Sequence, residues 1–257
     1  MNRFRQPKIS VVMPSIGRAY AQVAIASVLS QSIEDIELVV VMDPWIPPRS
    51  VYSDPPLPTD SRVRLVRPAA LGRCPDYLPA RIARLRNFGL EQTAGRYIAH
   101  LDDDNWWCEN HLEKLSRLLD ERPEIGFAHS WRTIVNEGGQ PHPLETYPWS
   151  TRFGNHDAIF AKFMEYGIAE KGQPYLRDTM LVSDDEIFHV DTSEFFVRRE
   201  IHDACRFRER FTLRQMMEGQ GEDRSLCEDL YRAEIKSACT EDYTLFYRLG
   251  GYSNADR

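Results

Sequence analysis

Three consecutive aspartates, Asp102, Asp103 and Asp104, follow the short, mostly apolar stretch Tyr97–Leu101 and are well suited to chemistry. The stretch predicts a strand buried on both faces of an α/β sheet. Three carboxylates at the end of such a strand repel one another, and the nearest basic side chain in sequence, Arg96, lies at its opposite end. A divalent cation would cancel this repulsion, because Mg²⁺ and Mn²⁺ take oxygen ligands and complete their shells with substrate phosphates.

The same carboxylates have a second interpretation as a helix cap. Asp104 or Asn105 would then occupy the N-cap of a helix that begins near Trp106, where acidic residues are common. One aspartate is enough for a cap, and the chain has three. The pattern favours a metal–phosphate site, and both interpretations stay open at this point.

The segments around the aspartates predict alternating strands and helices. We expect strands over 9–13, 36–42, 62–67 and 97–101 and helices over 19–31 and 79–93. Gly95 would close the second helix as its C-cap. Steps of this kind give a parallel, right-handed unit whose ligands bind beyond the carboxyl ends of the strands. Ser15, Asp43 and Asp102–Asp104 all fall on that edge.

The second half of the chain is less regular. We expect helices over 109–119, 158–166, 199–205 and 222–233 and strands over 125–135, 187–197, 235–240 and 243–248. The strand over 187–197 is expected to contain a turn, and the segment 235–240 could equally extend the helix before it. Residues 138–185, which contain prolines and aromatic side chains, are predicted to form an inserted lid or an acceptor-binding element.

Composition narrows the class of protein. The chain has 257 residues, 42% of them hydrophobic, which is enough for one large α/β domain. A net charge of −7 argues against nucleic acid or an anionic membrane as a partner. The five cysteines form no close pairs, so neither a disulfide framework nor a zinc site is expected. No signal peptide or membrane-spanning run is visible, so we expect a cytoplasmic protein, either free or peripheral to a membrane.

Several segments together resemble a known family. They are Ile9–Ser15, Ala26–Ser32, Ile36–Asp43, Arg86–Leu90, Ala94–Asp104 and Gly221–Leu226. In this order and spacing they resemble the family 2 glycosyltransferases, with an Arg-Asn-x-Gly helix, an Asp-x-Asp strand end and a late Glu-Asp motif. The resemblance covers roughly residues 8–135 and 187–250.

The resemblance implies a GT-A fold, an α/β structure with a mostly parallel central sheet flanked by helices. Residues 1–135 would form a Rossmann-like half that binds a nucleotide-sugar, and residues 136–257 an acceptor and catalytic-base half of the same domain. The implied reaction is inverting transfer of a sugar from a nucleotide-diphosphate donor, most often a UDP-sugar, with Mn²⁺ or Mg²⁺. The acceptor would be a hydroxyl of a glycan, glycolipid, protein or small molecule.

The resemblance also implies residues that contact the donor. Pro14 and Ser15 would lie beside it, Asp43 would contact the base, and Arg86 would lie near the nucleotide. Two departures leave the choice of base open. The usual Tyr-Asn after the first strand is Ile16-Gly17 here, and Met42 replaces the first of two acids at the second strand end.

The remaining implied roles concern the cation and the catalytic base. Asp102 and Asp103 match the ribose and metal side of Asp-x-Asp, and Asp104 matches its direct metal ligand. Asp223, preceded by Glu222, matches the general base that takes the acceptor's proton. No lysine or arginine can be assigned from the sequence to offset the charge on the leaving group, which favours metal dependence.

Two other acid pairs compete for the role of base, Glu228-Asp229 and Glu241-Asp242. The sequence favours Glu222-Asp223, because this pair follows a glycine-rich loop and opens a helix, so its side chains can face a cleft. Glu228-Asp229 falls in the middle of the helix, and Glu241-Asp242 opens a turn.

Two other classes of function are possible. A nucleotidyltransferase with a similar sheet would need a glycine-rich, basic phosphate loop after the first strand, and the Pro14–Arg18 segment is a poor match to one. A sugar-nucleotide-binding relative without transfer activity would lack the late acid that Asp223 provides.

Overall fold

The computed structural model describes residues 7–45, 58–69, 73–149, 155–181 and 187–250. Within these residues, nine strands form one mixed sheet in the order β3-β2-β1-β4-β8-β6-β9-β5, with β7 paired to β6. The sheet is flanked by helices, as expected, but it is mixed where the sequence predicted a mostly parallel one.

The first half of the sheet is parallel, and it confirms the predicted β–α–β steps. Its strands are β1 (Ile9–Ser15), β2 (Ile36–Met42), β3 (Val63–Val66) and β4 (Tyr97–His100), and its helices are α1 (Ala21–Leu29) and α2 (Leu78–Glu91). β1 is two residues longer than predicted, because Pro14 and Ser15 still pair with β2. Pro14 lies beyond the last pair of β1 with β4, so its missing N–H leaves no partner in β4 unsatisfied.

The second half makes the sheet mixed. β8 (Phe196–Arg198) runs antiparallel to β4 and to β6 (Phe127–Val135), while β9 (Ser237–Arg248) runs parallel to β6. β5 (Trp106–Trp107) is antiparallel to β9, and β7 (Tyr175–Leu176) to β6. The two strands predicted over 235–240 and 243–248 are one strand, whose pairing is irregular where Glu241 adopts a φ of 58°.

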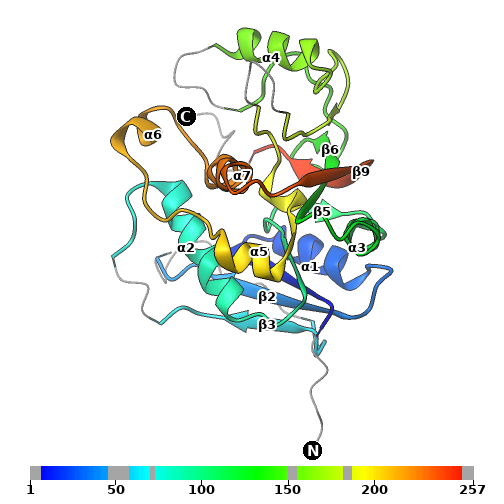
Figure 1. Ribbon diagram of the computed structural model, residues 1–257, viewed down its shortest axis with the longest axis vertical. Coiled ribbons are helices and arrows are strands. Elements are labelled where there is room, and N and C mark those ends of the chain that lie inside the picture. The colour runs from blue at the N-terminus through cyan, green and yellow to red at the C-terminus, as the bar shows by residue number, and fades with distance from the viewer. Residues whose placement is uncertain (1–6, 46–57, 70–72, 150–154, 182–186, 251–257) are drawn as a thin grey trace, which may run out of the picture.

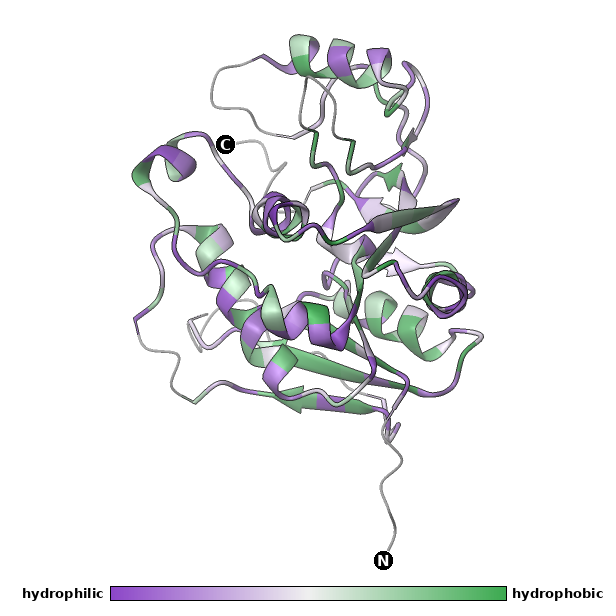
Figure 2. Ribbon diagram, viewed as in Figure 1, coloured by the Kyte–Doolittle hydropathy of each residue, from purple (hydrophilic) through white to green (hydrophobic). Residues whose placement is uncertain are grey.

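Helices cover both faces of the sheet (Figure 1). Apolar residues of α1 and of α3 (His111–Glu121) pack on one face, and those of α2 and α7 (Glu222–Arg232) pack on the other. The shorter helices are α5 (Arg199–Ala204) and α6 (Leu213–Met217). Figure 2 shows the strands as mostly hydrophobic, whereas the helices mix hydrophobic and hydrophilic residues, as expected for elements with one buried face.

Part of the predicted insertion forms a small unit of its own. α4 (His156–Glu165) lies apart from the parallel strands, at the top of Figure 1. Its Phe160 and Phe163 share an apolar cluster with Trp149 and with Tyr247 of β9. The unit is therefore joined to the sheet through aromatic packing beside β6 and β9.

The turn expected within 187–197 is confirmed as the 3₁₀ turn Thr192–Glu194, and β8 follows it. Two other predictions about elements are wrong. α2 ends at Glu91 with Gln92 as its C-cap, and Gly95 instead packs on β1, where an added Cβ would lie 2.6 Å from the Ser10 nitrogen. No helix begins near Trp106, since β5 follows the aspartates and α3 begins at His111, so the helix-cap interpretation fails. Within the described residues, no helix is both long and apolar enough to cross a membrane.

Candidate active site

The ends of β1 and β4 meet at Asp103, which is 2% exposed. Its Oδ2 accepts hydrogen bonds from the Ser15 hydroxyl at 2.6 Å and from the Ile16 N–H at 3.2 Å. Gly17, with a φ of 83°, allows the chain to turn here, and its N–H donates to the Ser15 Oγ at 3.0 Å. Ser15 therefore lies at the aspartate cluster, as the sequence predicted, and it fixes the most buried of the three carboxylates.

Arg18 supplies the counter-charge that the sequence did not assign. Its Nε donates to Asp103 Oδ1 at 3.0 Å and its Nη2 contacts the same oxygen, while its Nη1 lies 2.8 Å from Asp104 Oδ2. The sequence allowed no arginine to be assigned to this edge, and the structure places Arg18 there. Arg96, the nearest in sequence, instead pairs with Asp120.

Asp104, the third aspartate, is paired with Arg18. Its side chain is 13% exposed, and burial raises its pKa to about 7, although the adjacent Arg18 opposes this rise. Among the described residues, no three His, Cys, Asp or Glu side chains are grouped to hold a metal ion. A cation that one or two carboxylates share with substrate phosphates, as is usual for Mg²⁺, needs no such group.

Asp43 ends β2 at the same edge and is paired with a cation of α2. Its Oδ2 accepts from Arg81 Nε at 2.6 Å, and its Oδ1 accepts from the Trp45 N–H at 2.9 Å. The Arg81 guanidinium lies 5.6 Å from the centre of the Trp45 ring. The sequence identified Asp43 but neither Arg81 nor Trp45, whose proximity depends on how α2 packs against β2.

Arg86 connects the aspartate cluster to the late acid pair. It is 1% exposed, its Nη2 donates to Asp102 Oδ1 at 2.6 Å, and its Nε lies 3.6 Å from Glu222 Oε1. Glu222 is buried, and this burial raises its pKa to about 8, although Arg86 acts in the opposite direction. At neutral pH, Glu222 therefore favours its protonated form.

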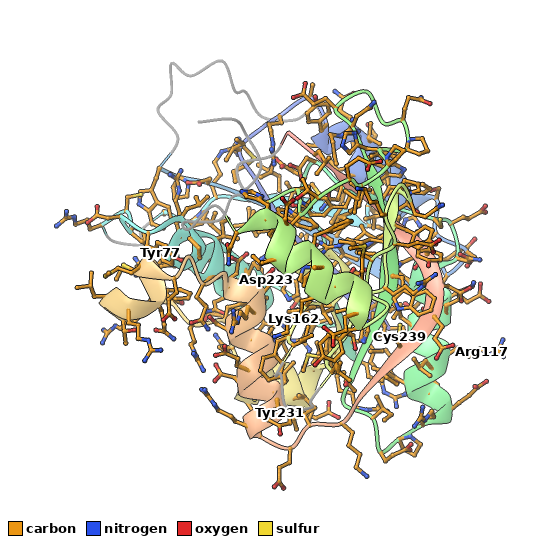
Figure 3. All side chains as sticks on the ribbon, turned by 90° about the horizontal axis from the view of Figure 1, so that it is seen from above. Tyr77, Arg117, Lys162, Asp223, Tyr231 and Cys239 are labelled. Carbon is orange, nitrogen blue, oxygen red and sulfur yellow. The ribbon has the colours of Figure 1, made fainter. Side chains whose placement is uncertain are left out.

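Asp223 occupies the first turn of α7 and is half-exposed. One of its oxygens, Oδ1, accepts from the Arg224 N–H at 2.6 Å. Figure 3 shows Asp223 at the end of α7 that lies toward Tyr77, with Tyr231 at the opposite end. The Tyr77 hydroxyl donates to the Gln220 carbonyl at 2.7 Å, which fixes the loop in front of Asp223.

The two rival acid pairs are occupied elsewhere. Asp229 accepts from Arg208 Nε at 2.7 Å, and Glu228 accepts from Gln220 at 2.9 Å. Asp242 is exposed and pairs with Lys114 of α3 at 2.7 Å. The structure thus brings Glu222-Asp223, and neither rival pair, to the ion pairs around Asp102.

A buried hydrogen-bond network around Arg132, which the sequence did not identify, contacts the Asp102 backbone through Ser193. Arg132, 3% exposed, donates to Asp191 at 2.7 Å and to Asp178 at 3.0 Å. Asp191 accepts from the Ser193 N–H, and the Ser193 hydroxyl accepts from the Asp102 N–H at 3.2 Å. Burial raises the pKa of Asp191 to about 6. The Asp-x-x-Glu pattern of a capping box at 191–194 is the sequence signal for this turn.

Parts of the chain are similar in sequence to known proteins. Residues 79–205 match the model of the family described as Glycosyl transferase family 2. A putative teichuronic acid biosynthesis glycosyltransferase, TuaG, of Bacillus subtilis is 30% identical over 139 residues, which are 53% of this chain and 51% of that protein. An uncharacterized glycosyltransferase of Haemophilus influenzae is 33% identical over 110 residues, 42% of this chain and 40% of that protein.

Two solved structures share the fold. TarS 1–349 of S. aureus in complex with UDP-GlcNAc has a TM-score of 0.55 at 15% identity, covering 97% of this chain and 61% of that one. The mannosyltransferase PcManGT of Pyrobaculum calidifontis, in complex with GDP-Man and Mn²⁺, has a TM-score of 0.55 at 12% identity, covering 98% and 59%.

Residues 79–205 are thus similar to family 2 glycosyltransferases, and the chain shares the α/β fold of GT-A type enzymes. The chain spans about half the length of its B. subtilis relative and about 60% of the solved chains.

Proposed function

We propose that this protein is an inverting glycosyltransferase that moves a sugar from a nucleotide-diphosphate donor, a UDP-sugar in the first instance, to an acceptor hydroxyl. The observation that carries the proposal is the position of Arg86. Its guanidinium contacts both Asp102 and Glu222, so one side chain joins the donor-side aspartates to the late acid pair. Residues 1–135 serve the donor in this proposal, and residues 136–257 serve the acceptor.

The donor lies along the carboxyl ends of β1, β2 and β4. Pro14 and Ser15 line its path, and Asp43, held by Arg81, contacts the base. Arg86 Nη1 is buried and has no hydrogen-bond partner among the described residues, whereas Nε is paired with Glu222, so Nη1 is the guanidinium group left for an oxygen of the donor. This supports the placement of Arg86 near the nucleotide.

A divalent cation, Mn²⁺ or Mg²⁺, would be held by Asp104, with Asp102 beside it and Asp103 on the ribose side. When bound, it would act as a Lewis acid on the diphosphate and offset the charge that builds as the sugar leaves. The protein's own contribution is a fixed carboxylate edge, because Asp103 is locked by Ser15 and Ile16, and Asp102 by Arg86 and Ser193.

Asp223 is the general base in this proposal. It is half-exposed at the start of α7 and can accept the acceptor's proton, whereas Glu222 is buried, retains its own proton near neutral pH and helps hold Arg86. A base of this kind typically contributes about 10²–10⁴ in rate. The inverting outcome follows from a single displacement in which the base and the departing diphosphate lie on opposite sides of the sugar.

Product analysis tests the reaction class. The protein is incubated with a panel of nucleotide-sugars and Mn²⁺, after a thermal-shift screen selects the donors that stabilise it. Release of a nucleoside diphosphate supports glycosyl transfer. In a parallel incubation with nucleoside triphosphates and sugar 1-phosphates, release of pyrophosphate would instead indicate a nucleotidyltransferase. Binding of donors without either product, across a broad acceptor panel, would favour a sugar-nucleotide-binding relative.

A further inference from the structure

The ion pair between Arg18 and Asp104 occupies the carboxylate that the proposed function needs for its cation. We infer that Arg18 is a latch on the donor site, and this inference rests on the proposed function. Without donor, its guanidinium holds Asp104. When a nucleoside diphosphate and a cation bind together, Nη1 of Arg18 leaves Asp104 and takes an oxygen of the donor's phosphates, which frees Asp104 for the cation.

The Arg18 guanidinium makes two kinds of contact, one with a carboxylate that is held in place and one that can be released. Nε and Nη2 contact Asp103, which is 2% exposed and is itself locked by Ser15 and Ile16. Among the described residues, Nη1 is paired with Asp104 alone, at 2.8 Å, and the arginine side chain is 24% exposed. The latch can therefore open by breaking the Nη1 contact while the fork on Asp103 stays in place. A lysine has no such fork.

The surrounding loop holds Arg18 in position for this exchange. Gly17 has a positive φ and donates its N–H to Ser15, which fixes the start of the loop. On the other side of Arg18, the Tyr20 ring lies 4.2 Å from the guanidinium carbon of Arg248, whose Nε donates to the Asp104 carbonyl at 3.1 Å. The loop and the aspartate turn are thus fastened to each other, and the exchange requires movement of a side chain only.

The other arginine at the aspartates has a different role. Arg86 is 1% exposed and lies between Asp102 and Glu222, so it is held from two sides. Arg18 has the more exposed side chain, and it contacts the aspartate that matches the metal ligand. Of these two guanidinium groups, Arg18 is the one that can change partners.

The charges predict how binding of the cation affects binding of the donor, and the reverse. A positive guanidinium on Asp104 repels a divalent cation, so the cation alone binds weakly. The phosphates of a donor carry enough negative charge to attract both the cation and Arg18. Cation and donor should therefore strengthen each other's binding, and by linkage the two enhancement factors are equal.

The test measures Mn²⁺ binding without nucleotide, by the electron paramagnetic resonance signal of free Mn²⁺, and UDP binding by calorimetry. Arg18→Gln should bind Mn²⁺ alone about tenfold or more tightly than the parent, because a unit charge a few ångström from Asp104 is removed. With saturating Mn²⁺ it should bind UDP about tenfold more weakly, because a phosphate contact is lost. The factor by which UDP strengthens Mn²⁺ binding should fall accordingly.

Two further variants make the result decisive. Arg18→Lys keeps the charge but cannot contact both carboxylates, so its affinity for Mn²⁺ alone should lie between those of the parent and Arg18→Gln. The control Arg117→Gln removes the same charge from the exposed face of α3, at an edge of the molecule away from Asp223 in Figure 3, and should change neither measurement.

The inference about Arg18 is contradicted if, without nucleotide, Arg18→Gln and Arg18→Lys both bind Mn²⁺ as the parent does, or more weakly. Failure of the proposed function looks different. In that case the parent itself binds UDP equally well with Mn²⁺ and with a chelator, whatever the Arg18 variants do.

Discussion

At the scale of single residues, Glu222 and Asp223 show how two adjacent acids acquire different roles. Glu222 points into the protein beside Arg86, and burial raises its pKa to about 8. Asp223, one residue later, is half-exposed in the first turn of α7. A buried acid that retains its proton can position a neighbour, and an exposed carboxylate can accept a proton. This division of roles leads to two predictions about residues, and a third concerns Asp43.

Asp223→Asn should lower turnover by roughly 10²–10⁴, because the amide keeps the size of the side chain but cannot accept the acceptor's proton. Donor affinity should stay nearly constant, since the interaction is used only in the transition state. Nucleoside diphosphate release and calorimetry on one preparation measure both quantities. If Asp223 were only a helix cap, Asn would serve as well and turnover would not change.

Glu222→Gln should become more stable relative to the parent as pH rises from 5 to 9. The folded state raises the pKa of Glu222 from 4.5 to about 8, so its favourable contribution is complete below pH 4.5 and is lost as pH rises toward 8. The amide variant has no such loss. Urea unfolding at the two pH values should show a relative gain on the order of 4 kcal/mol, from about 1.4 kcal/mol per pH unit over about three units, and a pH-independent difference would contradict the assignment.

Asp43→Ala should weaken UDP binding about 10- to 100-fold, which corresponds to losing a hydrogen bond to a charged group. The carboxylate is buried and accepts from Arg81 and from the Trp45 N–H, so it is already oriented at the end of β2. Calorimetry measures the affinity, and circular dichroism checks the fold. Unchanged UDP affinity in a folded variant would remove Asp43 from the site.

The acids of the candidate site could be found from the sequence, and their arginine partners could not. Asp43 and Asp102–Asp104 stand directly after predicted strands, so the topology alone places them at one edge. Arg18 and Arg81 are close to these acids only because of a turn after β1 and the packing of α2 on β2. Ion pairs of this kind depend on tertiary geometry, which leaves no fixed spacing in the sequence.

At the scale of elements, the 3₁₀ turn Thr192–Glu194 links the inserted unit to the aspartates. Arg132 of β6 pairs with Asp191 in front of the turn and with Asp178 of the insertion, and its guanidinium lies 4.8 Å from the centre of the Trp149 ring. Ser193 in the turn contacts the Asp102 N–H. The insertion and the donor edge therefore share one buried network.

Arg132→Gln should lower the free energy of unfolding by about 3–5 kcal/mol, because it leaves two buried carboxylates without their counter-charge. Urea denaturation measures the change. Arg117→Gln is the matched control, since it removes the same group from an exposed i,i+4 pair with Glu121 and should change stability by less than about 0.5 kcal/mol. Equal effects of the two variants would show that the Arg132 network contributes little to stability.

Elements with regular patterns were predictable, and those fixed by distant partners were not. The strands and helices of residues 9–100 follow from apolar periodicity, with ends shifted by one to two residues for most elements. β5 exists because it pairs with β9, and the long β9 exists because it pairs with both β5 and β6. Gly95 fits a cap pattern, yet it is needed for its close approach to Ser10. In these cases, contacts between residues far apart in the sequence determine the local structure.

At the scale of the whole molecule, one sheet carries both proposed halves. β4, which leads into the aspartates, pairs with β1 on one side and with β8 of the second half on the other. Two contacts beside Asp102 also join the halves. Arg86 of the first half pairs with Glu222 of the second, and Ser193 of the second half accepts from the Asp102 N–H of the first. A donor bound at β1, β2 and β4 would therefore lie within reach of α7, which is the geometry that sugar transfer requires.

The most direct test of this account is calorimetric titration of UDP into the parent protein, first with Mn²⁺ and then with a chelator. We predict that UDP binds at least about tenfold more tightly with Mn²⁺, because the cation joins the diphosphate to Asp104. In Asp104→Asn this difference should vanish while the chelator value stays near that of the parent. Equal UDP affinities in the two conditions, or no UDP binding in either, would contradict a cation-assisted nucleotide-sugar site.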